Sequence, residues 1–250
     1  MYTPIDREAK TEIPVLVMPR PGELNYYERI DAEGRLGAIN KPFSEPDRGI
    51  MLMEAGAVLE LLPVGTHRVL ECGCGTGWLS YFLAKSGFSV VGQDVSAHAI
   101  QLAQENPLFR ELPLGPEFVA CDFEALPYTE AFDAVVFFHA LHHALDERNA
   151  LAAACRALRP RGVLIAAEPG VGHGKAAREV MERYNVTDRD MPPRLLLRLG
   201  RQVGFRKGRI YPHAQALGAA VYRRRGWMTW AYANFHLLFA RRSGITVLFK

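Results

Sequence analysis

Short apolar stretches alternate with amphipathic stretches through the middle of this 250-residue chain. The apolar stretches predict strands, and apolar residues that recur every three or four positions between them predict helices. Continuous apolar strands separated by helices favour a parallel sheet with helices on both faces. The predicted strands are His67–Cys72, Phe88–Gln93, Glu117–Cys121, Phe132–Phe138 and Val163–Glu168, and the predicted helices are Gly77–Ser86, Ser96–Glu105 and Asp146–Leu158.

The flanking segments follow this pattern less regularly. Residues 1–22 contain four prolines, which indicates an extended arm. A short amphipathic helix is predicted over Glu23–Asp31, and a second one follows Ser44 as its N-cap and ends before Pro63. We therefore expect an N-terminal arm and helical region over residues 1–65 and the main domain over residues 66–250, within one globular unit.

Beyond Glu168 the alternation of strands and helices loosens. We predict helices over Gly174–Tyr184 and Pro193–Val203, and strands over Gly208–Tyr211 and Asn234–Arg241. Residues 243–250 are predicted to add an edge strand or a tail.

Three glycines stand at alternate positions after the first predicted strand, in the sequence Glu71-Cys-Gly-Cys-Gly-Thr-Gly-Trp78. Glycine lets the backbone approach a ligand closely, and the free N–H groups of the following helix make an electropositive end. Asp94 ends the next strand, where a carboxylate can accept hydrogen bonds from a ribose. These features predict a site for a cofactor that contains adenosine. Trp78 stands where a dinucleotide fingerprint requires its third glycine, so the spacing argues against a dinucleotide.

The pattern Glu-x-Gly-x-Gly-x-Gly followed by Asp94 resembles the class I S-adenosyl-L-methionine (SAM) dependent methyltransferases, in particular the small-molecule, type-11/12-like bacterial members. The run Leu158-Arg-Pro-Arg-Gly162 also resembles a Leu-x-Pro-Gly-Gly turn of that family, with Arg161 in place of glycine. The resemblance implies a Rossmann-like, seven-stranded, mostly parallel sheet with an antiparallel last strand and an N-terminal helical lid. Asn234–Arg241 has the appearance of that last strand. The implied cofactor is SAM, and the implied product is S-adenosyl-L-homocysteine.

The resemblance also assigns roles at the carboxyl ends of the strands. The three glycines would lie under the methionine and ribose portions of SAM, and Glu71 would orient the turn or the methionine amine. Asp94 would bind the ribose hydroxyls. The full set of implied cofactor-binding residues is Glu71, Gly73, Gly75, Gly77, Asp94, Val95, Asp122, Phe123, Phe138 and His139.

Three histidines, His139, His142 and His143, follow the fourth predicted strand. Histidine can act as a general base at neutral pH, so one of them could deprotonate an acceptor hydroxyl. Alternatively, the histidines serve structure or substrate shape, or they join Glu168 in a metal site. We take His143 and His139 as candidate bases and His142 as a candidate substrate contact, and we assign no metal ligand.

The N-terminal helices and the Lys41-Pro-Phe-Ser44 run resemble the lid of the same methyltransferases. Lids of this kind close over the cofactor and shape the acceptor pocket. Tyr26, Tyr27, Lys41 and Phe43 are therefore candidate substrate contacts. The alternative is that the aromatic side chains pack internally and that Lys41 is solvated.

The charges are distributed unevenly along the chain. Residues 156–250 contain 19 Lys and Arg against 5 Asp and Glu, whereas residues 1–155 contain 11 against 22. This split indicates an anionic partner, or two halves that face each other within one fold. The arginine-flanked aromatic segment over residues 223–236 could contact an anionic membrane surface or phosphates, or could simply be a helix and strand with solvated ends. No nucleic-acid-binding module is recognisable, so we expect no nucleic-acid partner.

Composition and motifs together lead to a functional prediction. No apolar window is long enough for a membrane span, Met1–Lys10 lacks the apolar core of a signal peptide, and the four cysteines form no Cys-x-x-Cys pair. We expect a cytoplasmic protein that transfers a methyl group from SAM to a small-molecule or carrier-linked acceptor, at oxygen, in sugar or secondary-metabolite biosynthesis. The alternative is a SAM-binding protein that transfers no methyl group, because it catalyses another reaction such as cyclisation or serves as an inactive scaffold partner.

Overall fold

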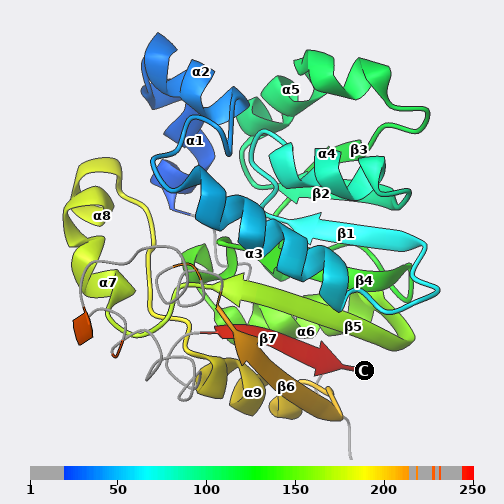
Figure 1. The fold of residues 1–250 in the computed structure, drawn as a ribbon. Helices are drawn as coiled ribbons and strands as arrows, with labels where there is room; N and C mark the ends of the chain where they lie inside the picture. The colour runs from blue at the N-terminus through cyan, green and yellow to red at the C-terminus, as the bar shows by residue number, and fades with distance from the viewer. Residues whose placement is uncertain (1–19, 214–217, 219–226, 229–230, 232–243) are drawn as a thin grey trace, which may run out of the picture.

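A computed structural model describes residues 20–213, 218, 227, 228, 231 and 244–250 (Figure 1). These residues form a seven-stranded sheet in the order β3-β2-β1-β4-β5-β7-β6. β1 to β5 pair in parallel, and β7 is antiparallel to both of its neighbours. The strands are β1 (Arg68–Cys72), β2 (Ser89–Asp94), β3 (Glu117–Ala120), β4 (Phe132–Phe138), β5 (Leu158–Glu168), β6 (Lys207–Pro212) and β7 (Gly244–Phe249). The predicted Rossmann-like α/β fold is confirmed.

Helices cover both faces of this sheet (Figure 1). The α-helices of the described residues are α1 (Pro21–Arg29), α2 (Ala32–Ile39), α3 (Arg48–Leu61), α4 (Trp78–Lys85), α5 (Ala97–Glu105), α6 (Glu147–Ala157), α7 (His173–Ala176), α8 (Arg178–Tyr184) and α9 (Pro193–Gln202). Short 3₁₀ helices are η1 (Pro107–Glu111), η2 (Phe123–Ala125) and η3 (Leu141–His143). None of the described helices combines the length and hydropathy that a membrane-spanning helix requires.

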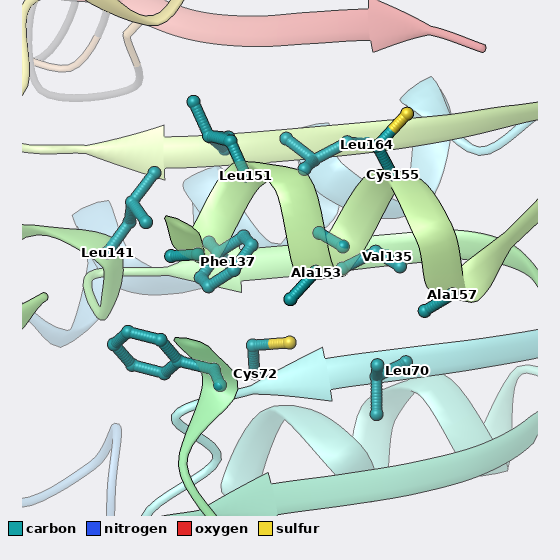
Figure 2. Packing of buried hydrophobic residues seen from close by; sticks show 14 of the residues in the cluster. Leu70, Cys72, Val135, Phe137, Leu141, Leu151, Ala153, Cys155, Ala157 and Leu164 are labelled. Carbon is teal, nitrogen blue, oxygen red and sulfur yellow. The ribbon is translucent and has the colours of Figure 1, made fainter. Parts of the chain in front are cut away.

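Two apolar clusters sandwich the sheet. Successive residues of a strand point to opposite faces, so Val135 and Phe137 of β4 join the cluster beneath α6 and α9, while Val136 joins the cluster beneath α3 and α4. Figure 2 shows part of the first cluster, where α6 packs on β4 and β5 and Leu70 and Cys72 of β1 lie beside Phe137 and Val135 of β4. Burial on both faces explains why the strands are continuously apolar instead of alternating.

The last strand is an interior strand, which corrects one prediction. Residues 243–250 were predicted to form an edge strand or a tail, but β7 lies between β5 and β6 and pairs with both. Ile245, Val247 and Leu248 are almost fully buried, because both faces and both edges of β7 are covered. The other predicted strand, Asn234–Arg241, lies outside the described residues.

The N-terminal helices also differ from the prediction. The sequence pattern did not predict α2, because Gly34 and Gly37 interrupt the regular spacing of its apolar residues. Asp31 caps this helix by accepting a hydrogen bond from Gly34 N. Ser44 was predicted as an N-cap, but α3 begins at Arg48, and the Ser44 hydroxyl instead donates to the carbonyl oxygen of Gly37 at 2.7 Å.

Smaller differences appear around β5. The predicted helix Gly174–Tyr184 is two short helices, α7 and α8. Arg161 has φ +69°, the left-handed conformation that favours glycine, and it occupies the position where the resembling turn carries glycine.

Candidate active site

A cavity of about 320 Å³ opens at the carboxyl ends of the parallel strands, which is where α/β sheets bind ligands. We call it the turn cavity. The turn after β1 and the ends of β2 and β4 line it, together with residues of α1 and of the loop after α8. Its lining is Glu23, Tyr26, Tyr27, Lys41, Met51, Gly73, Cys74, Gly75, Thr76, Trp78, Asp94, Val95, Phe123, Phe138, His139, Ala140, His143, Val180, Val186 and Asp188.

The glycine turn requires glycine at two of its positions in particular. Gly73 has φ +73° and Gly75 has φ +53°. A Cβ atom on Gly73 would lie 2.4 Å from the Ala140 side chain, and one on Gly75 would lie 2.7 Å from the Tyr27 hydroxyl. The turn therefore has both a conformation and a confined space that exclude a side chain.

Asp94 joins the turn to the end of β2. Its Oδ2 accepts a hydrogen bond from Gly75 N at 2.8 Å, and its Oδ1 accepts one from Ser96 N at 2.9 Å. Burial raises the pKa of this carboxyl above its usual range, although the two backbone N–H groups oppose the shift. Asp94 lines the turn cavity, where its remaining lone pairs can accept hydrogen bonds from a ligand.

Three of the predicted cofactor residues support the site from behind and do not line it. Glu71 is buried and accepts a hydrogen bond from the Ser80 hydroxyl of α4, and burial raises its pKa to about 8. Gly77 precedes α4, and a Cβ there would meet the Phe118 ring. Asp122 caps η2 by accepting a hydrogen bond from Glu124 N at 2.8 Å.

Apolar side chains supply the walls of the turn cavity. Val95 follows Asp94 at the end of β2, Phe123 lies in η2 after β3, and Phe138 ends β4, so the carboxyl ends of three strands of the sheet bring them to one cavity. The Trp78 ring packs against Phe138 edge to face, with 5.2 Å between the centroids. The Trp78 side chain therefore borders the cavity near the end of β4.

The first helix lies across one side of the cavity. Tyr26 and Tyr27 of α1, two of the candidate substrate contacts, both line it, and Tyr27 reaches the glycine turn. The Glu23 carboxylate accepts a hydrogen bond from Thr187 N at 2.6 Å, and Arg20 donates to the carbonyl oxygen of Val186. These contacts fix α1 to the loop after α8 above the cavity.

His139 forms part of a buried charged group. Its Nε2 lies 3.0 Å from Glu54 Oε2, and the other Glu54 oxygen lies 2.7 Å from His213 Nε2. Burial alone would raise the pKa of Glu54, but the hydrogen bonds of the two imidazoles outweigh it and lower the pKa to about 2. Burial alone would lower the pKa of His139, but the hydrogen bond with Glu54 outweighs it and raises the pKa.

The two following histidines have different surroundings. His142 is buried, its Nδ1 lies 2.7 Å from Glu168 Oε2, and it does not line the turn cavity. His143 does line the cavity, and its Nδ1 lies 2.5 Å from the Thr187 carbonyl oxygen. Burial opposes protonation of His143, but the nearby Glu23 carboxylate outweighs it and raises the pKa to about 9.

A second cavity of about 460 Å³ adjoins the first, and we call it the outer cavity. Lys41, Met51 and His139 line both cavities, so they stand at the junction. Lys41 also pairs with Glu45 at 3.6 Å. Phe43, the remaining predicted substrate contact, is 63% exposed and lines neither cavity.

Several residues of the site were not identified from the sequence. The most informative is Glu54, which occupies the same buried stripe of α3 as Ile50 and Val58 at four-residue spacing. A carboxylate within an apolar stripe signals a buried partner, although it does not identify that partner. Cys74 and Thr76 lie in the predicted glycine turn but were given no role, and Val186 and Asp188 lie in a loop whose path the pattern does not predict.

Comparison with known proteins agrees with this geometry. Residues 70–166 match the family model described as a methyltransferase domain. The chain is 26% identical over 147 residues to a ubiquinone biosynthesis O-methyltransferase of Hydrogenovibrio crunogenus, an alignment that covers 57% of this chain and 58% of that protein. It is 35% identical over 105 residues to the SAM-dependent Diels-Alderase iccD of Talaromyces variabilis, which covers 40% of this chain and 35% of that protein. The alignments thus span little more than half of these relatives, or less.

Solved structures share the fold. A Haemonchus contortus phosphoethanolamine N-methyltransferase 2 in complex with SAM superposes with a TM-score of 0.64 at 16% identity, covering 90% of this chain and 58% of that chain. The [4+2]-cyclase SpnF superposes with a TM-score of 0.55 at 21% identity, covering 81% of this chain and 80% of that chain.

The sheet order, the glycine turn with Asp94 and the match of residues 70–166 to a methyltransferase domain together support a class I SAM-dependent methyltransferase. Its cofactor is SAM. The cavity fits this cofactor, because a side chain at Gly75 would fill the cradle and because Asp94 offers acceptors for a ribose beside the apolar Val95 and Phe123.

Proposed function

We propose that the chain methylates an oxygen of a small-molecule or carrier-linked acceptor that occupies the outer cavity. One observation carries this proposal: His139 lines both cavities, while the buried carboxylate of Glu54 holds its Nε2. A side chain at this junction can meet an acceptor hydroxyl and a cofactor methyl group at the same time.

In this proposal the cofactor supplies the reactive methyl group, and the protein supplies binding and orientation. When bound, SAM supplies a methyl group on a sulfonium, which is already electrophilic, and its transfer to oxygen leaves the thioether S-adenosyl-L-homocysteine. Asp94 and the glycine turn hold the adenosine end, and α1 with Tyr26 and Tyr27 covers the cavity and excludes water. Positioning of this kind can supply about 7–11 kcal/mol in favourable cases.

His139 is the general base in this proposal, with Glu54 as the residue that positions it. Glu54 accepts a hydrogen bond from Nε2–H, so the lone pair of Nδ1 can take the proton of the acceptor hydroxyl. The imidazolium that forms is stabilised by the buried carboxylate beside it. His143 lines the turn cavity but not the outer cavity, and Thr187 and Glu23 hold its ring. These contacts suit a role in the wall of the cavity better than a role as the base.

The acceptor that this geometry favours carries a hydroxyl and an anionic group. Lys41 lies beside His139 at the junction and, paired only loosely with Glu45, can contact an acceptor anion. The basic C-terminal third of the sequence supports the same preference.

A second function is favoured by a specific observation. One relative is named a Diels-Alderase and one solved neighbour a [4+2]-cyclase, so this fold also accompanies reactions that transfer no methyl group. Such a protein would bind SAM and leave its methyl group in place.

One experiment separates the two functions. The protein is incubated with methyl-labelled SAM and the small-molecule extract of its source cells, and products are separated by mass. Methyl transfer predicts a product heavier by one methyl group together with S-adenosyl-L-homocysteine. Intact SAM and a rearranged, unmethylated product would overturn the proposal in favour of cyclisation. His139→Gln is expected to lower kcat by roughly 10²-fold or more and to leave S-adenosyl-L-homocysteine affinity unchanged; unchanged kcat would remove His139 as the base.

A further inference from the structure

Three polar side chains converge beside the turn cavity. They are His142 of η3, His173 of α7 and Asp188 of the loop after α8, and the nitrogen or oxygen atom that each presents lies within 4.8 Å of the other two. Asp188 Oδ1 lies 2.6 Å from His173 Nε2 and 3.8 Å from His142 Nε2. The His173 nitrogen and the Asp188 oxygen are buried, yet neither makes a hydrogen bond of acceptable geometry with any described residue.

The neighbouring carboxylate fixes the tautomer of His142. Glu168 is almost fully buried and accepts hydrogen bonds from the N–H groups of Ala140 and Leu141. It also lies 2.7 Å from His142 Nδ1, so that nitrogen carries the proton. His142 Nε2 therefore presents a lone pair to the Asp188 carboxylate, and two acceptors that face each other repel unless a positive group lies between them.

A protonated His173 would satisfy only part of this arrangement. It could pair with Asp188, but the lone pair of His142 would still face a carboxylate. A histidine whose Nδ1–H is held by a carboxylate and whose Nε2 is directed at other donors is the usual arrangement around a protein-bound metal.

The donor atoms suit a small divalent transition metal. Ligands at about 2.0–2.1 Å from a tetrahedral Zn²⁺ lie roughly 3.3 Å from each other, and the observed separations of 2.6 and 3.8 Å fall on either side of that value. Two imidazoles and one carboxylate favour Zn²⁺ over Mg²⁺ or Ca²⁺, which prefer oxygen donors.

The Glu54, His139 and His213 group is arranged differently. In Glu54, one oxygen meets His139 and the other meets His213, so each imidazole faces an oxygen of its own. At the site of His142, two imidazoles converge on a single oxygen of Asp188.

We propose that His142, His173 and Asp188 bind one Zn²⁺ ion, with water as the fourth ligand. The ion joins η3, α7 and the loop after α8. Asp188 also lines the turn cavity, so the ion fixes one wall of the cofactor site without taking part in methyl transfer. The proposal is independent of the acceptor and of the reaction.

Metal binding by the chelator-stripped, tag-free full chain tests this site. The protein is dialysed against Zn²⁺ and, in parallel, Co²⁺; bound metal is measured by mass spectrometry, and Co²⁺ coordination is followed by visible absorption. His173→Ala removes a partly exposed ligand from a short helix, and Asp188→Asn removes the carboxylate. His67→Ala is the matched control, because it removes a histidine next to β1, remote from the three ligands.

We expect one Zn²⁺ per wild-type chain, a visible Co²⁺ spectrum of low coordination number, and a rise in Tm with Zn²⁺. His173→Ala and Asp188→Asn should bind at least about tenfold more weakly and lose the rise in Tm, whereas His67→Ala should behave like the wild type. The proposal is overturned if the wild type binds no more metal than His173→Ala, or if His67→Ala loses as much. Circular dichroism confirms that each variant is folded.

Discussion

At the scale of single residues, the cofactor site depends on positions where no side chain fits. Gly75 combines φ +53° with a Tyr27 hydroxyl that would lie 2.7 Å from an added Cβ. The N–H group of the same glycine donates a hydrogen bond to Asp94 Oδ2. Gly75 of the turn therefore contacts both Tyr27 of α1 and the carboxylate of Asp94.

Gly75→Ala should weaken S-adenosyl-L-homocysteine binding at least tenfold, because the turn or Tyr27 must move. The matched control is Gly56→Ala in α3, where a Cβ meets nothing within 4 Å. Because Gly56 is an exposed position within the helix, this change should stabilise the fold by about 0.5–1 kcal/mol and leave affinity unchanged. Calorimetric titration and thermal unfolding measure both quantities, and equal affinities in the two variants would contradict the role of the turn.

The pair of Glu54 and His139 makes a prediction about pH. Glu54 raises the pKa of His139, and the base must be neutral, so kcat/KM should rise with pH through a midpoint above the usual histidine value. Glu54→Gln keeps a hydrogen-bond acceptor and removes the charge, which lowers the pKa of His139. The acid limb of the profile should therefore move to lower pH by roughly one unit, with a smaller plateau.

The control for this profile is Glu60→Gln, an exposed position on the same helix. Its acid limb should coincide with that of the wild type. An acid limb that stays in place in Glu54→Gln would show that His139 is not the group that titrates.

At the scale of elements, α1 acts as a cover that depends on the loop after α8. Gly22 lies against the backbone of Tyr184 and Asn185, so close that a Cβ would lie 2.1 Å from the Tyr184 carbonyl oxygen. Glu23 and Arg20 bind the backbone of Thr187 and Val186 just beyond. Because the atoms that an added Cβ would meet belong to the backbone, a change of side-chain rotamer could not remove the clash.

Gly22→Ala should consequently lift α1 from the loop and weaken cofactor binding, while the sheet remains intact. Gly37→Ala in α2 is the matched control, because a Cβ there has open space. Hydrogen exchange should increase over residues 20–30 in the first variant only. Unchanged exchange and affinity in Gly22→Ala would exclude α1 from the cover of the site.

At the scale of the whole molecule, much of the architecture follows from the sequence. The apolar runs of β1, β2 and β4 are long enough to indicate strands buried on both faces, and the glycine turn with Asp94 then predicts where the cofactor binds. β7 could not be placed in this way, because an apolar run carries no information on which strands will flank it. Its position follows from long-range pairing with β5 and β6.

The sequence predicts only part of the candidate site, for a similar reason. Asp94 was predicted from its place at the end of a strand, and Phe123 and Phe138 were predicted through the resemblance to the methyltransferases. Glu54 and Asp188 were not predicted, because their contacts join separate elements. Glu54 of α3 contacts His139 after β4, and Asp188 contacts His173 across the intervening helix α8. Sequence spacing predicts local neighbours, whereas these contacts depend on how separate elements pack.

We expect the cavity at the glycine turn to bind SAM through Asp94. Calorimetric titration of S-adenosyl-L-homocysteine into the wild type, Asp94→Asn and the control Asp146→Asn, whose carboxylate caps α6, tests this binding most directly. We expect one site per chain, at least tenfold weaker binding in Asp94→Asn because a charged acceptor is lost, and wild-type affinity in the control. Absence of binding to the wild type, or equal affinity in Asp94→Asn, would contradict it.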